Sequence, residues 1–177
     1  MRNCIGVWKV GLIVVLAMMM AGCSLLEETA VKLTDHLDAE TAILDYLDAT
    51  NPIIEECYDI EVAAETGFWA EEDDAKALAF LTETTIPALE KVLQKTKEVT
   101  VDWEPLQASH EALILSNEKL LESYVIYAED MSSGNFEMSE EASAAYDLSF
   151  EEFDKHERLF AETAEEYKVD VYLEEEE

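Results

Sequence analysis

The sequence predicts an all-α fold, an antiparallel up-down bundle of four helices in which the first two are kinked. Only two glycines follow residue 23, Gly67 and Gly134, and each lies where a helix is expected to end. Apolar side chains recur at alternating spacings of four and three residues, the pattern of helices that pack through one face. No segment before residue 169 alternates like a strand, and long helices joined by short loops favour up-down packing.

The first two predicted helices run from about Glu27 to Thr66 and from about Ala70 to Val99. Pro52 and Pro87 each remove one backbone hydrogen bond, so both helices are expected to kink. Acidic residues occupy the predicted first turn of the second helix, where they suit the helix dipole: Glu71, Glu72, Asp73 and Asp74. The predicted inward faces comprise Leu33, Leu37, Leu44, Leu47, Ile54 and Tyr58 in the first helix, and Leu78, Leu81, Thr85, Ala88 and Val92 in the second.

The third predicted helix begins at the cap Asp102, tolerates Pro105 in its first turn and ends near Ser132. The fourth opens at Ser139 and runs to about Lys168. Their stripes are longer and more regular than those of the first two helices. They comprise Leu106, His110, Leu113, Asn117, Leu120, Tyr124, Tyr127 and Met131, and then Tyr146, Phe150, Phe153, Phe160, Ala164 and Tyr167, with Glu157 as the exception.

The N-terminus has the features of a secretory leader. Arg2 and Lys9 are basic, Val10–Met20 is an apolar run, and Ala21–Gly22 supplies small residues before Cys23. The run is shorter than the roughly 20 apolar residues of a membrane span. Met20-Ala21-Gly22-Cys23 resembles the lipobox of bacterial prolipoproteins, which implies that Cys23 is acylated and becomes the new N-terminus. The alternative is an uncleaved signal anchor.

The resemblance covers the leader alone, and it implies a signal peptide (1–22) and the lipidated Cys23 with a short tether (23–28). The helix pattern predicts a four-helix bundle (29–173) after them, and a run of glutamates forms an acidic tail (174–177). The resemblance also implies an extracytoplasmic protein on the outer face of a membrane, which the protein contacts through the lipid on Cys23. Residues 23–177 suffice for one domain, but they are too few for a two-lobed transport-binding protein.

The chain is strongly acidic. It has 11 Lys and Arg residues against 42 Asp and Glu residues, a formal charge of −31. Because Arg2 and Lys9 lie in the leader, which has no acids, residues 23–177 keep 9 of the bases and all 42 acids, a formal −33. Such a surface repels nucleic acid, so a nucleic-acid partner is excluded. The acidity fits either a saline or alkaline exterior or a cation-attracting role.

Sequence motifs of catalysis are absent. No histidine has Glu three residues before it, and there is no Gly-x-Ser-x-Gly, Gly-rich phosphate loop or Cys-x-x-Cys-His. Cys57 is the only cysteine after Cys23, so it has no partner for an intramolecular disulfide. We therefore expect a non-enzymatic binding or envelope-associated lipoprotein without a cofactor, acting on a protein partner or a cation. The alternative is a cation-binding or transition-metal-binding lipoprotein.

Three histidines could form a metal site. Antiparallel pairing places His36, His110 and His156 in the same half of the bundle, among many carboxylates. The competing interpretation is that His110 is hydrogen-bonded within the seam while the other two are solvated.

A polar layer is predicted where the two proline kinks come level. Thr50, Asn51, Thr85 and Asn117 would surround the carbonyls that the prolines leave free. This layer is either a small ligand pocket or a set of polar groups satisfied locally within a bent bundle.

Aromatic residues gather at the two loops farthest from the leader: Phe68, Trp69 and Phe136. They could contact a partner protein. They could equally close the end of the core, as Trp103 would at the other end.

Overall fold

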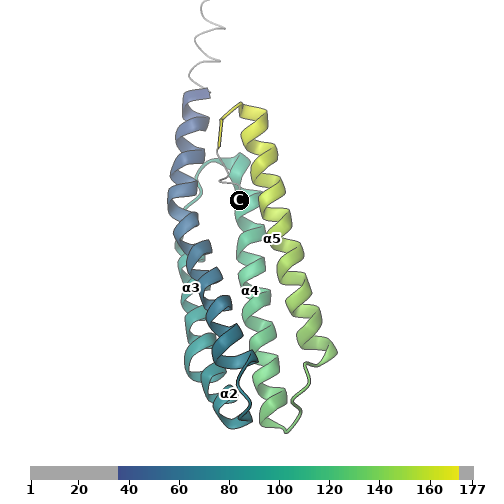
Figure 1. The fold of residues 1–177 in the computed structure, drawn as a ribbon. Coiled ribbons are helices and arrows are strands. Elements are labelled where there is room, and N and C mark those ends of the chain that lie inside the picture. Colours follow the sequence, from purple (N-terminus) through teal and green to yellow (C-terminus); the bar gives the residue numbers. More distant parts are fainter. Residues whose placement is uncertain (1–35, 172–177) are drawn as a thin grey trace, which may run out of the picture. The chain divides into compact units, whose positions relative to one another are not determined.

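The computed structural model describes residues 36–171, which are helical for most of their length (Figure 1). The predicted leader, Cys23 and the tail 174–177 lie outside the described residues. The chain divides into two compact units, residues 1–41 and 42–177. The contacts and the pocket described below belong to the second unit.

The described residues are 85% helical, form four helices and contain no strand, which confirms the all-α class. The first helix covers residues 36–64 and continues into the π-helical turn η1 (Glu65–Trp69). The second consists of α2 (Asp74–Phe80), the π-helical turn η2 (Leu81–Thr85) and α3 (Ile86–Glu98). The third and fourth are α4 (Glu104–Ser132) and α5 (Glu140–Tyr167).

The predicted start of α5 is confirmed, and the predicted starts of α2 and α4 differ from those in the structure. Ser139 caps α5 by accepting a hydrogen bond from the amide of Ala142 at 3.3 Å, which confirms that start. Asp73 caps α2 through the amides of Ala75 and Lys76, so Glu71 and Glu72 precede the helix instead of lying in its first turn. The Asp102 cap was also wrong, because the extended residue before α4 is Trp103, whose side chain makes no capping bond.

The two glycines act differently. Gly134 follows α4 with φ +84°, a left-handed conformation that costs glycine little, and this confirms it as a helix stop. Gly67 instead lies inside η1, so the predicted stop there was wrong. A Cβ on Gly67 would overlap the ring of Phe80, and close approach of that ring therefore favours glycine at this position.

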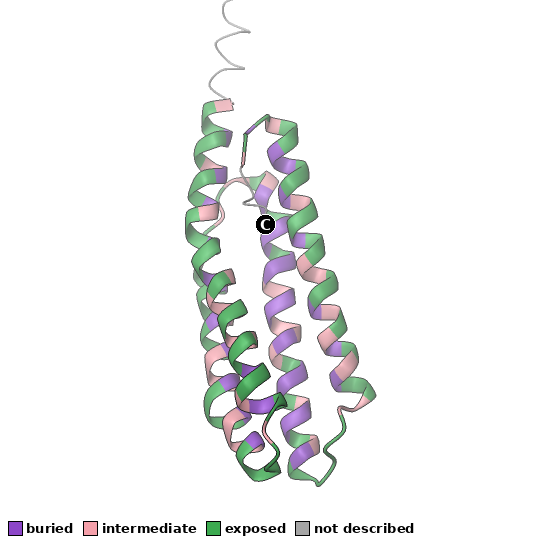
Figure 2. Cartoon of the chain, viewed as in Figure 1, coloured by how far each residue is buried: buried purple, intermediate pink, exposed green. Residues whose placement is uncertain are grey.

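Buried side chains form two clusters. One joins the α2–α3 segment to the second half of α4, with Phe68, Leu81, Leu89 and Tyr124 among its members. The other joins the first helix to the start of α4 and the end of α5. Figure 2 shows that α4 is the most continuously buried helix. All eight residues of the stripe predicted for α4 are buried, which confirms that face.

The predicted face of the first helix was wrong. The face predicted for α5 is confirmed at Phe160 and Ala164, which are buried, and was wrong at Phe150. Leu44 and Tyr58 are 46% and 68% exposed, while Ile43 and Tyr46 are buried. In α5, Phe150 is 50% exposed and Ser149 is buried in its place.

Small side chains explain the difference in α5. Its buried face includes Ala142, Ala145 and Ser149, which let α5 approach α4 closely. Hydroxyls of α4 donate across this interface: Ser123 Oγ bonds the carbonyl of Ala142 at 2.8 Å, and Ser109 Oγ bonds that of His156 at 3.1 Å. A hydrophobic stripe therefore marks the buried face at Phe160 and Ala164 but not in the first half of α5.

The acidic surface gives a prediction for stability. Ion pairs such as Lys97–Glu118 at 2.6 Å join exposed side chains and are individually weak. Because like charges on the folded surface repel and salt screens them, the thermal unfolding midpoint is expected to rise from low to molar sodium chloride. Circular dichroism at several salt concentrations measures it. A midpoint that stays flat or falls would contradict self-repulsion as a limit on stability.

Candidate functional site

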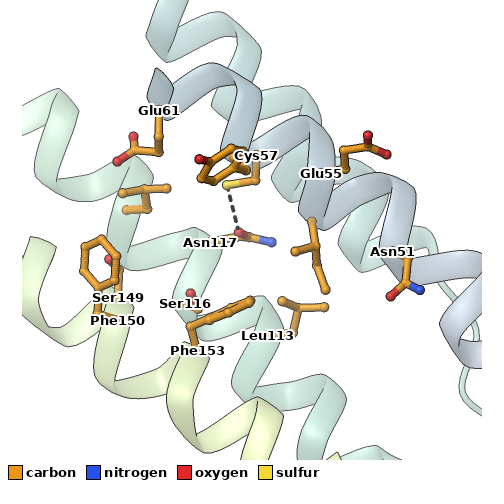
Figure 3. A pocket seen from close by; sticks show the side chains of 13 residues that line it. Asn51, Glu55, Cys57, Glu61, Leu113, Ser116, Asn117, Ser149, Phe150 and Phe153 are labelled. Atoms are coloured by element: carbon orange, nitrogen blue, oxygen red, sulfur yellow. Dashed lines mark hydrogen bonds between the residues drawn. The ribbon is translucent and has the colours of Figure 1, made fainter. Parts of the chain in front are cut away.

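A pocket of about 670 Å³ opens between the first helix, α4 and α5 (Figure 3). The first helix contacts α5 on both sides of it. Tyr46 stacks on Phe160 with ring centroids 6.0 Å apart, and the Tyr146 hydroxyl donates to Glu61 Oε2 at 3.2 Å. Between these contacts the helices leave the space that Asn51, Glu55, Cys57, Tyr58, Glu61, Leu113, Ser116, Asn117, Ser149, Phe150 and Phe153 line, together with Ile54 and Leu120.

Asn117 holds a polar network at the wall of the pocket. Its Nδ2 donates to Thr96 Oγ1 at 2.9 Å, and its Oδ1 accepts from Cys57 Sγ at 3.7 Å. Thr96 Oγ1 donates in turn to the carbonyl of Val92 at 2.9 Å. The buried amide therefore has partners from α3 and the first helix, and it fixes the position of the Cys57 side chain.

Glu61 is the least satisfied polar group of the pocket. Its Oε1 is buried and has no hydrogen-bond partner in the described part of the chain, and the same holds for the Tyr124 hydroxyl. Burial raises the pKa of Glu61, while the hydroxyls of Tyr124 and Tyr146, which face the carboxyl, oppose this rise. Glu61 Oε1 and the Tyr124 hydroxyl therefore face each other without a hydrogen bond of normal geometry.

Cys57 is a thiol rather than a thiolate at neutral pH. Burial raises its pKa to about 12, and the charges of Glu61 and Glu56 add to the effect. Since the thiolate is the nucleophile of cysteine chemistry, Cys57 is suited to packing and to its contact with Asn117.

The structure brings together two of the four predicted pocket residues. Asn51 and Asn117 line the same pocket. Thr50 and Thr85 are buried outside it: the Thr50 hydroxyl donates to the Tyr46 carbonyl at 2.8 Å, and Thr85 Oγ1 has no hydrogen-bond partner among the described residues.

Sequence reasoning missed the acidic side of the pocket. A signal was present, because Asn51, Glu55, Tyr58 and Glu61 follow one another at spacings of three or four residues and so share a helix face. Thr96 and Cys57, the two partners of Asn117, had no such signal.

The predicted histidine cluster forms only in part. His110 and His156 lie around Tyr46, with centroid distances of 5.7 and 6.2 Å to its ring. Burial lowers the pKa of both, which favours the neutral form. His156 is 5% exposed and its Nδ1 lies 2.8 Å from Ser109 Oγ, so the interpretation of a solvated His156 was wrong.

The third histidine, His36, belongs to the other compact unit. Within residues 36–171 no group of three or more His, Cys, Asp or Glu side chains could hold a metal ion. The three-histidine site stays a prediction, and the described geometry lends it no support.

The aromatic residues at the loops are not equivalent. Phe68 is 3% exposed and packs edge-on against Tyr127 at 5.5 Å, so it closes the core and its proposed partner contact was wrong. Trp69 contacts Phe68 and stacks on Tyr127, whose hydroxyl donates to the carbonyl of Phe136 at 2.9 Å. Trp69 and Phe136 are 46% and 48% exposed. Trp103 packs on Tyr167 at 4.7 Å beside the second buried cluster.

Comparison with protein-family models, with curated proteins and with solved structures finds no match for this chain. None of the described helices combines the length and the apolar character needed to cross a membrane.

Proposed function

We propose that this chain is a lipid-anchored, extracytoplasmic lipoprotein whose helical body binds a small organic ligand without catalysing a reaction. The observation that carries the binding role is the pocket of about 670 Å³, which is within the range of small-molecule sites. Its walls are mainly apolar, with a few polar groups at fixed positions, and this composition is typical of ligand pockets.

The arrangement of the four helices as an antiparallel up-down bundle is part of this proposal. Two contacts support it: the Tyr46 end of the first helix meets Phe160, and its Glu61 end meets Tyr146, so the chain directions of the two helices are opposed. The turn η2 directly precedes Pro87, where a disturbed hydrogen-bond ladder favours a kink.

The chemistry of the pocket supports binding over catalysis. Its one thiol is protonated at neutral pH, and neither His110 nor His156 is among the lining residues. A pocket whose described thiol is not activated as a nucleophile fits a protein that holds a ligand unchanged.

Anchoring rests on the lipobox-like junction before Cys23. Changing Cys23→Ser is expected to abolish labelling by a fatty-acid probe and to leave an unprocessed precursor, because serine has no thiol to acylate. Cys57→Ser is the matched control. Because Cys57 lies in the helical body, the proposal expects this variant to be labelled at Cys23 like the wild type. Labelling that persists in Cys23→Ser would show that the anchor is elsewhere or absent.

The binding role gives a prediction for Asn117→Leu. The apolar side chain fills part of the pocket, while Thr96 keeps its hydrogen bond to Val92, so the fold is expected to survive with an equal or higher melting temperature. Ligand-induced stabilisation, which reaches about 2.7 kcal/mol at a hundredfold excess over the Kd, is expected to be lost.

A thermal-shift screen of small amphipathic alcohols, amines and carboxylates on both proteins measures this. Gln107→Leu is the control, because it also replaces an amide side chain of α4 with leucine, at an exposed position outside the pocket. If no compound shifts the wild type, the pocket is not a binding site and the protein acts through its surface.

The alternative of a cation-binding lipoprotein keeps support from the formal charge of −31. A transition-metal site would give saturable binding of Zn²⁺ in a calorimetric titration with salt present.

A further inference from the structure

We propose that the ligand of this pocket is an organic cation with an apolar body, whose ammonium group faces Glu61 and whose body lies against Tyr58, Phe150 and Phe153. This inference rests on the proposed ligand-binding function and adds the chemical class of the ligand.

The first argument is the charge of the pocket. Within residues 36–171, Glu55 and Glu61 are the charged side chains that line the pocket, and no Lys, Arg or His of this range lines it. The whole chain adds a formal −31, so the field at the entrance attracts cations and repels anions. A carboxylate or phosphate ligand would therefore find neither a counter-charge nor a favourable field.

The second argument is the aromatic wall. Tyr58 and Phe150 are 68% and 50% exposed, although both are large and Phe150 is fully apolar. Figure 3 places Phe150 and Phe153 on the α5 side of the pocket and Glu61 on the opposite helix. Aromatic faces that lie near a carboxylate stabilise an organic ammonium group through cation–π attraction while covering its apolar body.

The third argument is the state of Glu61. It is the one lining residue with a buried polar atom that lacks a hydrogen-bond partner in the described part of the chain. An ammonium group at this wall of the pocket carries the charge opposite to the carboxylate and can donate a hydrogen bond to it beside the Tyr124 and Tyr146 hydroxyls.

A bare metal ion fits the pocket poorly. The volume suits an organic molecule, and the described residues hold no group of three or more side chains able to ligate a metal. The combination of a large apolar space with two carboxylates therefore selects a cation that brings its own apolar body.

The test uses four probes with the full-length protein: 4-phenylbutylamine, 4-phenylbutanol, 4-phenylbutyrate and butylamine. The first three share one apolar body and differ in charge, and the fourth keeps the charge without the ring. Calorimetric titration at about 0.3 M sodium chloride suppresses diffuse attraction to the acidic surface. The amine is expected to bind about tenfold more tightly than the alcohol, with no binding of the carboxylate or of butylamine.

Two variants locate the interaction. Glu61→Gln keeps the shape of the side chain, and it is expected to weaken binding of 4-phenylbutylamine about tenfold while leaving 4-phenylbutanol unchanged. Asp59→Asn, an exposed residue of the same helix outside the pocket, removes the same charge and is expected to have no effect. Phe153→Leu keeps apolar volume without the ring and is expected to weaken the amine more than the alcohol. If Glu61→Gln does not fold, the difference between the amine and the alcohol in Phe153→Leu tests the cation inference instead.

The outcomes separate the two proposals. Equal binding of the alcohol and the amine, or binding of the amine that Glu61→Gln leaves intact, would overturn the cation inference and leave ligand binding in place. No binding of any of the four probes at millimolar concentration would overturn the proposed function together with the inference.

Discussion

Replacing Tyr46 with Ala is expected to lower the free energy of unfolding by about 3–5 kcal/mol, the usual cost of removing a buried aromatic side chain. Tyr46 is 4% exposed, and the rings of His110, His156 and Phe160 surround it at 5.7–6.2 Å. Its loss would leave a cavity where the first helix, α4 and α5 meet. Urea denaturation followed by circular dichroism measures the change.

The matched control is Tyr58→Ala. Tyr58 lies on the same helix, is 68% exposed, and its removal is expected to change stability by less than about 0.5 kcal/mol. A large loss for Tyr58→Ala with little for Tyr46→Ala would mean that the helix presents the face that its sequence predicts. The described packing would then be incorrect.

The success of the prediction for α4 and its failure for the first helix have one physical cause. Hydrophobic spacing identifies a buried face when large apolar side chains fill it, as Leu106, Leu113 and Leu120 do in α4. The first helix has leucines and tyrosines on several sides, and it buries Tyr46 and the hydroxyl of Thr50 while leaving Leu44 in solvent.

The fourth helix shows a further limit of hydrophobic spacing. Its contact with α4 uses Ala142, Ala145 and Ser149, and serine hydroxyls of α4 bond two facing carbonyls. Small residues of this kind carry little hydrophobic signal, although they allow the closest approach of two backbones. The prediction therefore chose Phe150, which instead borders the pocket.

The candidate site was predictable at two residues, Asn51 and Asn117. Asn117 interrupts an otherwise apolar stripe, and its burial follows from that position. Its partners were not predictable, because Thr96 and Cys57 depend on how α3 and the first helix rotate against α4. The predicted polar layer placed Thr50 and Thr85 at the same level along the bundle as Asn117. The level of a residue along a helix does not give the direction of its side chain. The Thr50 hydroxyl bonds its own helix instead.

Replacing Phe68 with Ala is expected to lower the free energy of unfolding by about 3–5 kcal/mol, whereas Phe136→Ala is expected to cost less than about 0.5 kcal/mol. Phe68 is 3% exposed and contacts both Trp69 and Tyr127, so its removal opens the end of a buried cluster.

Phe136 is 48% exposed, and its contact with Tyr127 runs through its backbone carbonyl, which alanine retains. Urea denaturation of both variants measures the difference. Similar small losses for the two would mean that Phe68 does not close the core, and would return it to the surface that was predicted to meet a partner protein. A large loss for Phe68→Ala alone leaves Trp69 and Phe136 as the half-exposed aromatic residues through which this end of the molecule can make contacts.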